Sequence, residues 1–223
     1  LEIGPGKGAM TSLLLEKCES LTAIEIDKDL IRFLKKAYRD RKNINLIEKD
    51  ILFYHPKELV RLNKLIGNKP YNISTPIIEW IIDNKSSFDE IFLMLQKEFG
   101  ERCVAQPNTK SYGRLSIFVQ CFFDVTVIRE VDKSSFTPSP KVQSIFLKLI
   151  PKVSDKTPNS ILMKNLSILT REAFSKRRKL ITNSLKSFFA EEDLVNLGIE
   201  RKSRPENLSV ETYIKLAKSI QSG

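Results

Sequence analysis

Short apolar runs alternate with amphipathic stretches along the first two thirds of the 223-residue chain. The apolar runs are rich in β-branched residues and predict strands, while the stretches between them repeat apolar positions at helical spacing. The predicted strands are Leu1–Ile3, Leu21–Ile26, Ile44–Glu48, Lys64–Gly67, Glu90–Leu95, Leu115–Phe122 and Gln143–Ile150. The predicted helices are Ala9–Lys17, Lys28–Arg39, Pro76–Asn84 and Gln96–Ala105. This alternation predicts an α/β fold with a mostly parallel, doubly wound sheet, whose last two strands form an antiparallel hairpin at one edge.

The pattern changes after the polar, proline-bracketed segment from Pro151 to Pro158, which is typical of a linker. Beyond it the strand signals stop, and helical spacing covers 161–174, 177–189, 191–197 and 210–219, with Ser209 as the N-cap of the last helix. We therefore predict two domains, a doubly wound domain over residues 1–152 and a small all-helical domain over residues 153–223. The first begins within a buried strand and without an initiator Met, so we expect its N-terminal arm to be missing.

Charge indicates the kind of partner. The chain has 37 Lys and Arg against 27 Asp and Glu, a net charge of +10. Of this excess, +6 belongs to residues 151–223 and only +4 to the first 150 residues. Between Lys164 and Lys186 seven basic residues face a single acid, Glu172. A basic stretch of this density predicts contact with the phosphates of a nucleic acid, although most such stretches are simply solvated.

Several function classes are disfavoured by what the chain lacks. No apolar run approaches the roughly 18 residues of a membrane span. The three cysteines, Cys18, Cys103 and Cys121, include no C-x-x-C pair, so neither a disulfide framework nor a zinc site is expected, and a reducing cytoplasm is the predicted location. His55 is the only histidine, so any mechanism with a Ser-His or Cys-His pair would have to use it.

The carboxyl ends of the first three predicted strands carry residues suited to a nucleotide. The glycine turn Glu2-Ile-Gly-Pro-Gly-Lys-Gly8 joins the first strand to a helix, an arrangement that dinucleotide-binding folds also use. Glu25 ends the second strand, where an acid can accept both ribose hydroxyls, and Asp50 follows the third, where it can accept from an adenine amino group. Ligands bind at this edge of open α/β sheets, so we expect an adenosine-containing cofactor there.

The fourth strand leads into Asn68-Lys-Pro-Tyr71, the most specific motif in the chain. An adenine amine is a poor nucleophile because its lone pair is delocalised into the ring. Two acceptors aimed at its hydrogens, the Asn68 side-chain oxygen and the Pro70 carbonyl, would rehybridise and orient the nitrogen for attack on a sulfonium methyl group. Tyr71 would stack on the base, and Phe136, in the proline-rich loop before the last strand, could stack on its other face. This motif favours an amino-methyltransferase over a dehydrogenase.

Six ordered motifs together resemble the KsgA/Dim family of ribosomal RNA adenine dimethyltransferases. They are Glu2-Ile-Gly-Pro-Gly-Lys-Gly8, Ile24-Glu-Ile-Asp27, the run from Asn68 to Pro76, Tyr112-Gly-Arg-Leu-Ser116, Phe136-Thr-Pro-Ser-Pro-Lys-Val142 and Ala173-Phe-Ser-Lys-Arg-Arg-Lys179. The resemblance runs from Leu1 to about Ala217. It implies a Rossmann-like class I methyltransferase domain that uses S-adenosylmethionine to dimethylate the N6 amines of two adjacent adenosines near the 3′ end of small-subunit ribosomal RNA.

Site residues follow from the resemblance, position by position. The predicted catalytic residues are Asn68, Pro70 and Tyr71, and Tyr71 and Phe136 contact the target base. The predicted cofactor-binding residues are Glu2, Gly4, Gly6, Glu25, Ile26, Asp50, Ile51 and Asn68. The basic run between Lys164 and Lys186, rather than the resemblance, supplies the predicted RNA-binding residues Arg171, Lys176, Arg177, Arg178 and Lys179. We expect a cytoplasmic monomer that acts on an immature small ribosomal subunit in ribosome biogenesis, without a metal ion or a membrane.

Three alternatives stay open on the sequence. A related large-subunit RNA adenine methyltransferase would share most of these motifs. A non-catalytic nucleic-acid-binding protein built on the same fold would keep the domains, although the intact Asn68, Pro70 and Tyr71 argue against lost catalysis. A Rossmann dehydrogenase is the weakest alternative, because no acid for hydride transfer is apparent.

Overall fold

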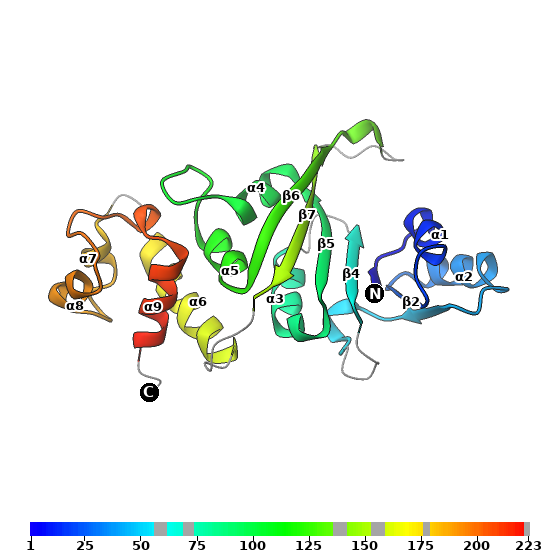
Figure 1. Cartoon of the computed structure of the whole chain (residues 1–223), viewed down its shortest axis with the longest axis horizontal. Helices are drawn as coiled ribbons and strands as arrows, with labels where there is room; N and C mark the ends of the chain where they lie inside the picture. Colours follow the sequence, from blue (N-terminus) through cyan, green and yellow to red (C-terminus); the bar gives the residue numbers. More distant parts are fainter. Residues whose placement is uncertain (56–61, 69–73, 136–141, 153–158, 176–178, 221–223) are drawn as a thin grey trace. The chain divides into compact units, whose positions relative to one another are not determined.

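The structure is a computed structural model. It describes residues 1–55, 62–68, 74–135, 142–152, 159–175 and 179–220 (Figure 1). Seven strands form one sheet in the order β3-β2-β1-β4-β5-β7-β6. Their bounds are β1 Glu2–Ile3, β2 Leu21–Glu25, β3 Ile44–Glu48, β4 Lys64–Asn68, β5 Glu90–Gln96, β6 Phe123–Val131 and β7 Ser144–Pro151. Strands β1 to β5 pair in parallel, and β7 pairs antiparallel with β5. The predicted doubly wound α/β sheet with an antiparallel element near one edge is confirmed.

Burial along the strands explains this arrangement. Every residue of β2 is buried, as is typical of a parallel strand covered on both faces, whereas buried positions alternate along β5. In the centre of the sheet, Ile3 of β1 lies between Ile24 of β2 and Gly67 of β4. The residues that follow these three positions therefore emerge at the same carboxyl edge, which is where a doubly wound sheet binds its ligand.

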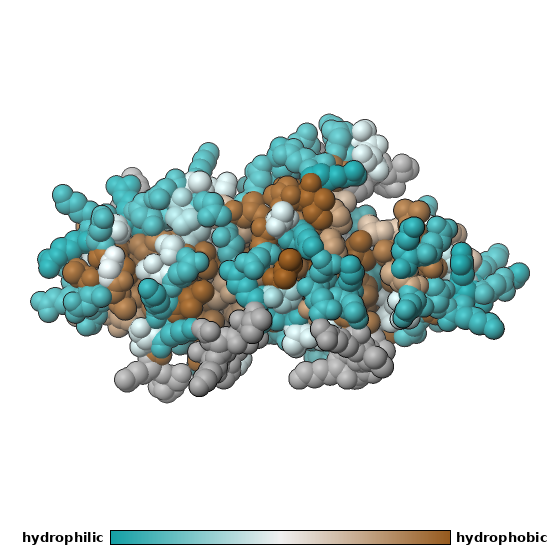
Figure 2. Space-filling view, viewed as in Figure 1, coloured by the Kyte–Doolittle hydropathy of each residue, from teal (hydrophilic) through white to brown (hydrophobic). Residues whose placement is uncertain are grey.

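Helices follow the parallel strands as predicted, with ends that differ by a few residues. Their bounds are α1 Ala9–Leu15, α2 Lys28–Ala37, α3 Ser74–Asp83 and α4 Lys97–Val104. Short 3₁₀ turns complete the connections, namely η1 Ile51–Phe53, η4 Lys85–Ser87 and η5 Lys133–Ser135. Hydrophilic side chains cover the surface of the α2 region, at the right of Figure 2.

Two compact units make up the chain. The first contains residues 1–97 and 126–151, and the second contains residues 98–125 and 152–223. The second unit is helical, with α5 Arg114–Phe122, α6 Asn159–Ser175, α7 Ile181–Ser184, α8 Glu191–Asn196, η6 Pro205–Asn207 and α9 Val210–Ser219. The predicted helical domain from residue 153 thus forms most of this unit, to which the structure adds residues 98–125. No helix in the described part of the chain is long and apolar enough to cross a membrane.

One predicted strand is wrong, because residues 115–122 form helix α5. The run is apolar and rich in β-formers, but short apolar runs do not separate buried strands from buried helices. Buried Ser116 fixes the helical start, since its hydroxyl accepts from the Gly113 N–H at 3.1 Å and donates to the Arg102 carbonyl at 2.6 Å. The side chain of Gln120 then donates to the carbonyls of Cys103 and Ala105. The edge strand, β6, begins only at Phe123.

The second predicted helix of the C-terminal region is also too long. In place of a helix over 177–189, the described residues contain α7 over only Ile181–Ser184. The helix starts late because Leu180 has an extended backbone and the N–H of Ile181 donates to the Ser203 carbonyl at 2.8 Å. The last helix matches its prediction, and the Ser209 side chain accepts from the Thr212 N–H as the expected N-cap. Residues 153–158 of the predicted linker lie outside the described residues.

Candidate cofactor and adenine site

The turn after β1 contains three glycines in left-handed backbone conformations. The φ angles of Gly4, Gly6 and Gly8 are 65°, 59° and 83°, a region that L side chains rarely adopt. The Gly4 N–H donates to the Ile24 carbonyl of β2 at 2.9 Å, and the Gly8 N–H donates to the Pro5 carbonyl at the same distance. The turn is therefore held against β2 while it leads into α1.

Gly6 and Gly8 have different surroundings. A Cβ atom on Gly8 would lie 2.7 Å from the Tyr38 hydroxyl and 3.1 Å from a Leu34 methyl group, so α2 packs directly on this glycine. The Tyr38 hydroxyl donates to the Gly8 carbonyl at 3.1 Å. A Cβ on Gly6 would meet no atom within 4 Å, so open space adjoins the backbone there. Gly8 is required by packing, while Gly6 leaves room for a ligand.

The carboxylate of Glu25 joins the end of β2 to this turn. One of its oxygens accepts from the Gly6 N–H at 3.2 Å, and the other accepts from the N–H groups of Ile26 at 2.9 Å and Asp27 at 3.2 Å. The residue is only 6% exposed. Main-chain donors thus hold the carboxylate in one orientation beside the open space at Gly6.

Glu2 is a second buried acid, within β1. It is 3% exposed, and its carboxylate accepts from the Thr11 hydroxyl of α1 at 2.8 Å. Burial raises the pKa of Glu2, and the hydrogen bond from Thr11 opposes this rise. The carboxylate of Glu2 therefore ties β1 to α1 in the structure, and its predicted contact with the cofactor stays a prediction.

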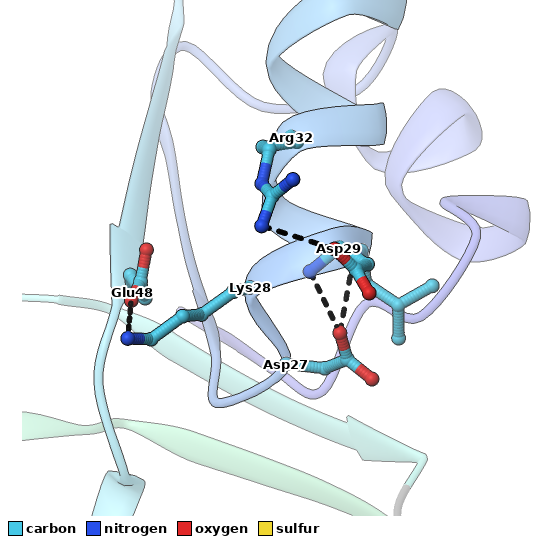
Figure 3. Close-up of polar contacts among 6 residues, drawn as sticks. Asp27, Lys28, Asp29, Arg32 and Glu48 are labelled. Atoms are coloured by element: carbon cyan, nitrogen blue, oxygen red, sulfur yellow. Dashed lines mark hydrogen bonds and ion pairs between the residues drawn. The ribbon is translucent and has the colours of Figure 1, made fainter.

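Asp27 and Asp50 each cap a helical turn. The Asp27 carboxylate accepts from the N–H groups of Asp29 and Leu30 at the start of α2 (Figure 3). The Asp50 carboxylate accepts from the Leu52 N–H at 3.0 Å at the start of η1. These bonds explain why acids occupy both positions, since side-chain acceptors satisfy the first N–H groups of a helix. Asp50 is half-buried and keeps a second oxygen for the predicted cofactor contact.

The two isoleucines predicted to contact the cofactor follow the ends of β2 and β3. Ile26 is 56% exposed, which is unusual for a large apolar residue beside a buried strand, whereas Ile51 is 1% exposed. An exposed Ile at the ligand edge of the sheet offers an apolar surface to a flat ring. Ile51 belongs to the core, so its predicted contact with the cofactor stays a prediction.

Asn68 ends β4 at the same edge of the sheet. The preceding residue, Gly67, pairs with Ile3, which places Asn68 level with Gly4 at the start of the glycine turn. Asn68 is exposed at this position. The other predicted base contacts, Pro70, Tyr71 and Phe136, lie outside the described residues.

These features fit a nucleoside cofactor. The structure brings the open backbone at Gly6, the fixed carboxylate of Glu25 and the exposed side chains of Ile26 and Asn68 to one edge of the sheet. Oriented carboxylates suit ribose hydroxyls, and an exposed apolar side chain suits a purine face. The arrangement matches what the sequence predicts for S-adenosylmethionine.

Comparison with known proteins decides the family. A family model described as ribosomal RNA adenine dimethylase matches residues 1–222. The chain belongs to the ribosomal RNA adenine dimethylase family. It is therefore an S-adenosylmethionine-dependent rRNA adenine dimethyltransferase with a class I methyltransferase fold, as the six motifs imply.

Individual relatives agree with this family. A ribosomal RNA small subunit methyltransferase A from Coxiella burnetii is 39% identical over 97% of this chain and 84% of its own length. The protein of that name from Legionella pneumophila strain Corby is 40% identical over 100% of this chain and 86% of its own length. Among solved structures, a dimethyladenosine transferase from Plasmodium falciparum superposes with a TM-score of 0.81 at 31% identity, over 96% of this chain and 86% of that one.

The dimethylase contains positioning contacts that the sequence analysis missed. Thr11 and Tyr38 hold the glycine turn and its helix through Glu2 and Gly8, but nothing in their local sequence marks them. Tyr38 falls in the last turn of a predicted amphipathic helix, where an aromatic residue is ordinarily read as core. The Tyr38 hydroxyl reaches its acceptor, the Gly8 carbonyl, because α2 packs against the glycine turn.

The predicted RNA-binding residues of the dimethylase are only partly described. Arg171 lies on α6 and Lys179 shortly before α7, and both are exposed in the second unit. Lys176, Arg177 and Arg178 lie outside the described residues. Contact of this group with RNA stays a prediction.

Proposed function

We propose that this dimethylase methylates the N6 amines of two adjacent adenosines in a loop near the 3′ end of small-subunit ribosomal RNA. The names of the relatives from Coxiella and Legionella support the choice of the small subunit. The observation that carries the proposal is the convergence of Gly6, Glu25 and Asn68 at one edge of the sheet. The proposed substrate is an immature small subunit, and the proposed enzyme is a cytoplasmic monomer.

The cofactor half of the site consists of the residues around the glycine turn. S-adenosylmethionine supplies an electrophilic methyl group on its sulfonium. In our proposal the carboxylate of Glu25 accepts from the ribose hydroxyls, and Asp50 accepts from the adenine amine of the cofactor. Gly4 and Gly6 let the backbone approach the cofactor closely, and Ile26 covers a face of its adenine ring. Glu2 and Ile51 support this half from inside the fold.

The substrate half acts on the nitrogen. The side-chain oxygen of Asn68 and the carbonyl of Pro70 accept from the N6 hydrogens, so the nitrogen lone pair is freed from the ring and aimed at the methyl group. As the nitrogen–carbon bond forms, the carbon–sulfur bond breaks and its electron pair stays on sulfur. The nitrogen then loses a proton to solvent. Tyr71 and Phe136 hold the flipped base between their rings.

The C-terminal basic residues would hold the RNA. Arg171 and Lys179 are exposed cations on the helical unit, and Lys176, Arg177 and Arg178 complete the proposed phosphate-binding group. A base in a loop leaves its stack more easily than one in a duplex, which favours a hairpin loop as the target.

Transfer of labelled methyl groups tests the proposal. The protein is incubated with labelled S-adenosylmethionine and either immature small subunits or protein-free large-subunit RNA, and the methylated nucleotides are mapped. We expect label in two adjacent adenosines of the small-subunit RNA. Label confined to large-subunit RNA would instead support the large-subunit alternative.

A further inference from the structure

The positive charge of the first 150 residues is concentrated in one short segment. Residues 28–42, which contain α2 and the turn after it, include seven basic and two acidic residues, a net charge of +5. The first 150 residues as a whole carry only +4, so the rest of that region is slightly negative. This segment contains as many basic residues as the longer C-terminal run from Lys164 to Lys186, so its basic residues are more densely spaced.

The helix arranges these cations on one side. At 3.6 residues per turn, Lys28, Arg32, Lys35 and Lys36 fall within an arc of roughly 100°, away from the buried Ile31 and Leu34. Arg39, Arg41 and Lys42 continue the positive charge beyond the end of the helix. We call these seven cations the α2 stripe. All seven are exposed.

Internal ion pairs do not account for the stripe. Lys28 lies 3.9 Å from Glu48, and Arg32 lies 3.2 Å from Asp29, with the side chains of both cations 76% exposed (Figure 3). Arg39 pairs with its neighbour Asp40. Within the described part of the chain, no ion pair involves Lys35, Lys36, Arg41 or Lys42. Four cations are thus available to an external anion.

The helix dipole explains only part of the stripe. Cations in the last turn of a helix are favourable, which covers Lys35 and Lys36. It does not explain Lys28 in the first turn, nor Arg41 and Lys42 beyond the helix. Phe33, which is 51% exposed, flanks the stripe and offers a ring on which a base can stack. Cations interleaved with an exposed aromatic side chain suit RNA.

The stripe leads away from the reacting edge of the sheet. Lys28 lies beside Glu48, the last residue of β3, whereas Lys42 precedes Ile44, the first residue of β3. The helix between them spans about 15 Å at 1.5 Å per residue. RNA lying along the whole stripe therefore includes nucleotides well beyond the base that Asn68 receives.

We propose that the α2 stripe is a second RNA-binding surface, which holds the phosphate backbone of ribosomal RNA outside the target loop. This inference rests on the proposed function for the identity of the RNA. In this proposal the methyltransfer domain binds the substrate through its own cations, in addition to the C-terminal basic residues. An anionic membrane surface carries the same kind of negative charge. RNA is the favoured partner because this family modifies RNA.

Binding at several salt concentrations tests the stripe. Protein-free small-subunit RNA is titrated with wild type, with the double variant Lys35→Gln/Lys36→Gln and with the control Lys17→Gln/Arg129→Gln. The control removes the same charge from exposed positions of the same unit that lie off the stripe. A third variant, Lys35→Arg/Lys36→Arg, keeps the charge at the stripe.

We expect the stripe variant to lower the slope of log affinity against log salt by about 1.4–1.8, which corresponds to two lost phosphate contacts. Its affinity should fall on the order of 10-fold, while the control and the arginine variant stay near wild type. Equal slopes for the stripe variant and the control would overturn the proposal, as would a loss of binding to anionic vesicles with RNA binding unchanged.

The same preparations separate this proposal from the proposed function. Methyl transfer to a short RNA that ends at the target loop should proceed in the stripe variant at the wild-type rate, because that RNA does not reach the stripe. If wild type binds the RNA but methylates no small-subunit adenosine, the proposed function is wrong, and the salt slopes still decide the stripe.

Discussion

The carboxylate of Glu25 accepts a hydrogen bond from the Gly6 N–H across 3.2 Å, so the acid that ends β2 holds the glycine turn that follows β1. Two residues 19 positions apart in the chain thereby form one wall of the proposed cofactor site. The contact fixes the carboxylate before a ligand arrives, and preorganised groups of this kind bind with a smaller entropic cost.

Replacing Glu25 should weaken the binding of S-adenosylmethionine. In Glu25→Gln one carboxylate oxygen becomes an NH₂ group, which faces main-chain donors instead of accepting from them, and the charge that favours ribose hydroxyls is lost. We expect the dissociation constant to rise by about 10- to 100-fold in calorimetric titration. Glu19→Gln, at an exposed acid of the same unit, is the control and should bind normally. Equal affinities of the two variants would exclude a direct role for Glu25.

Alanine at Gly8 should mainly lower stability, whereas alanine at Gly6 should mainly weaken cofactor binding. Gly8→Ala places a Cβ 2.7 Å from the Tyr38 hydroxyl at a φ of 83°, and we expect a loss of about 2–3 kcal/mol in urea unfolding. Gly6→Ala has only the backbone strain, about 1 kcal/mol, but its methyl group enters the open space proposed for the cofactor.

The double variant Gly8→Ala/Tyr38→Phe identifies the cause of that loss. Removing the hydroxyl relieves the closest contact, so part of the stability of Gly8→Ala should return. If Gly6→Ala and Gly8→Ala lose the same stability and Tyr38→Phe restores nothing, packing of α2 on the turn is not what requires Gly8.

Glu2 should make the stability of the protein fall as pH rises. Burial raises the pKa of Glu2, so the folded state keeps a proton at pH values where the unfolded state has released it. The resulting contribution to the free energy of unfolding is complete below the ordinary pKa of 4.5 and is lost as the pH rises above that value. In Glu2→Gln, which can still accept from Thr11, this part of the pH dependence should disappear. Urea unfolding at several pH values between 4 and 8 measures the difference, using ~1 pH unit steps. Parallel curves for the variant and wild type would contradict the assignment.

Ser116 should matter more than an exposed serine with a similar bond. Its buried hydroxyl accepts from Gly113 and donates to Arg102, so Ser116→Ala leaves two main-chain groups without that partner and should cost about 1–3 kcal/mol. Ser12→Ala removes an exposed bond to the Ala9 carbonyl and should change the unfolding free energy by less than about 0.5 kcal/mol. Similar losses in both variants would mean that Ser116 does not anchor α5.

Particular residues show which parts of the fold and of the site the sequence predicts. The strands β1 to β5 are apolar over short stretches between turn signals, so local pattern identifies them and their ends locate Glu25 and Asn68. The helix α5 has an equally apolar pattern, and only tertiary contacts of Ser116 and Gln120 distinguish it from a strand. Similarly, Glu25 was predicted to lie at the site, but its bond to Gly6 depends on the register of β1 with β2, which no local pattern reveals.

Methyl transfer by Asn68→Ala tests the central claim most directly. The control is Asn63→Ala, an exposed residue just before β4. Both variants are assayed with saturating labelled S-adenosylmethionine and immature small subunits, and cofactor binding is measured separately. If Asn68 holds the target nitrogen, its variant should lose about 10²-fold or more in kcat while cofactor affinity changes only a few-fold, and the control should match wild type. A kcat within a few-fold of wild type in Asn68→Ala would contradict the account.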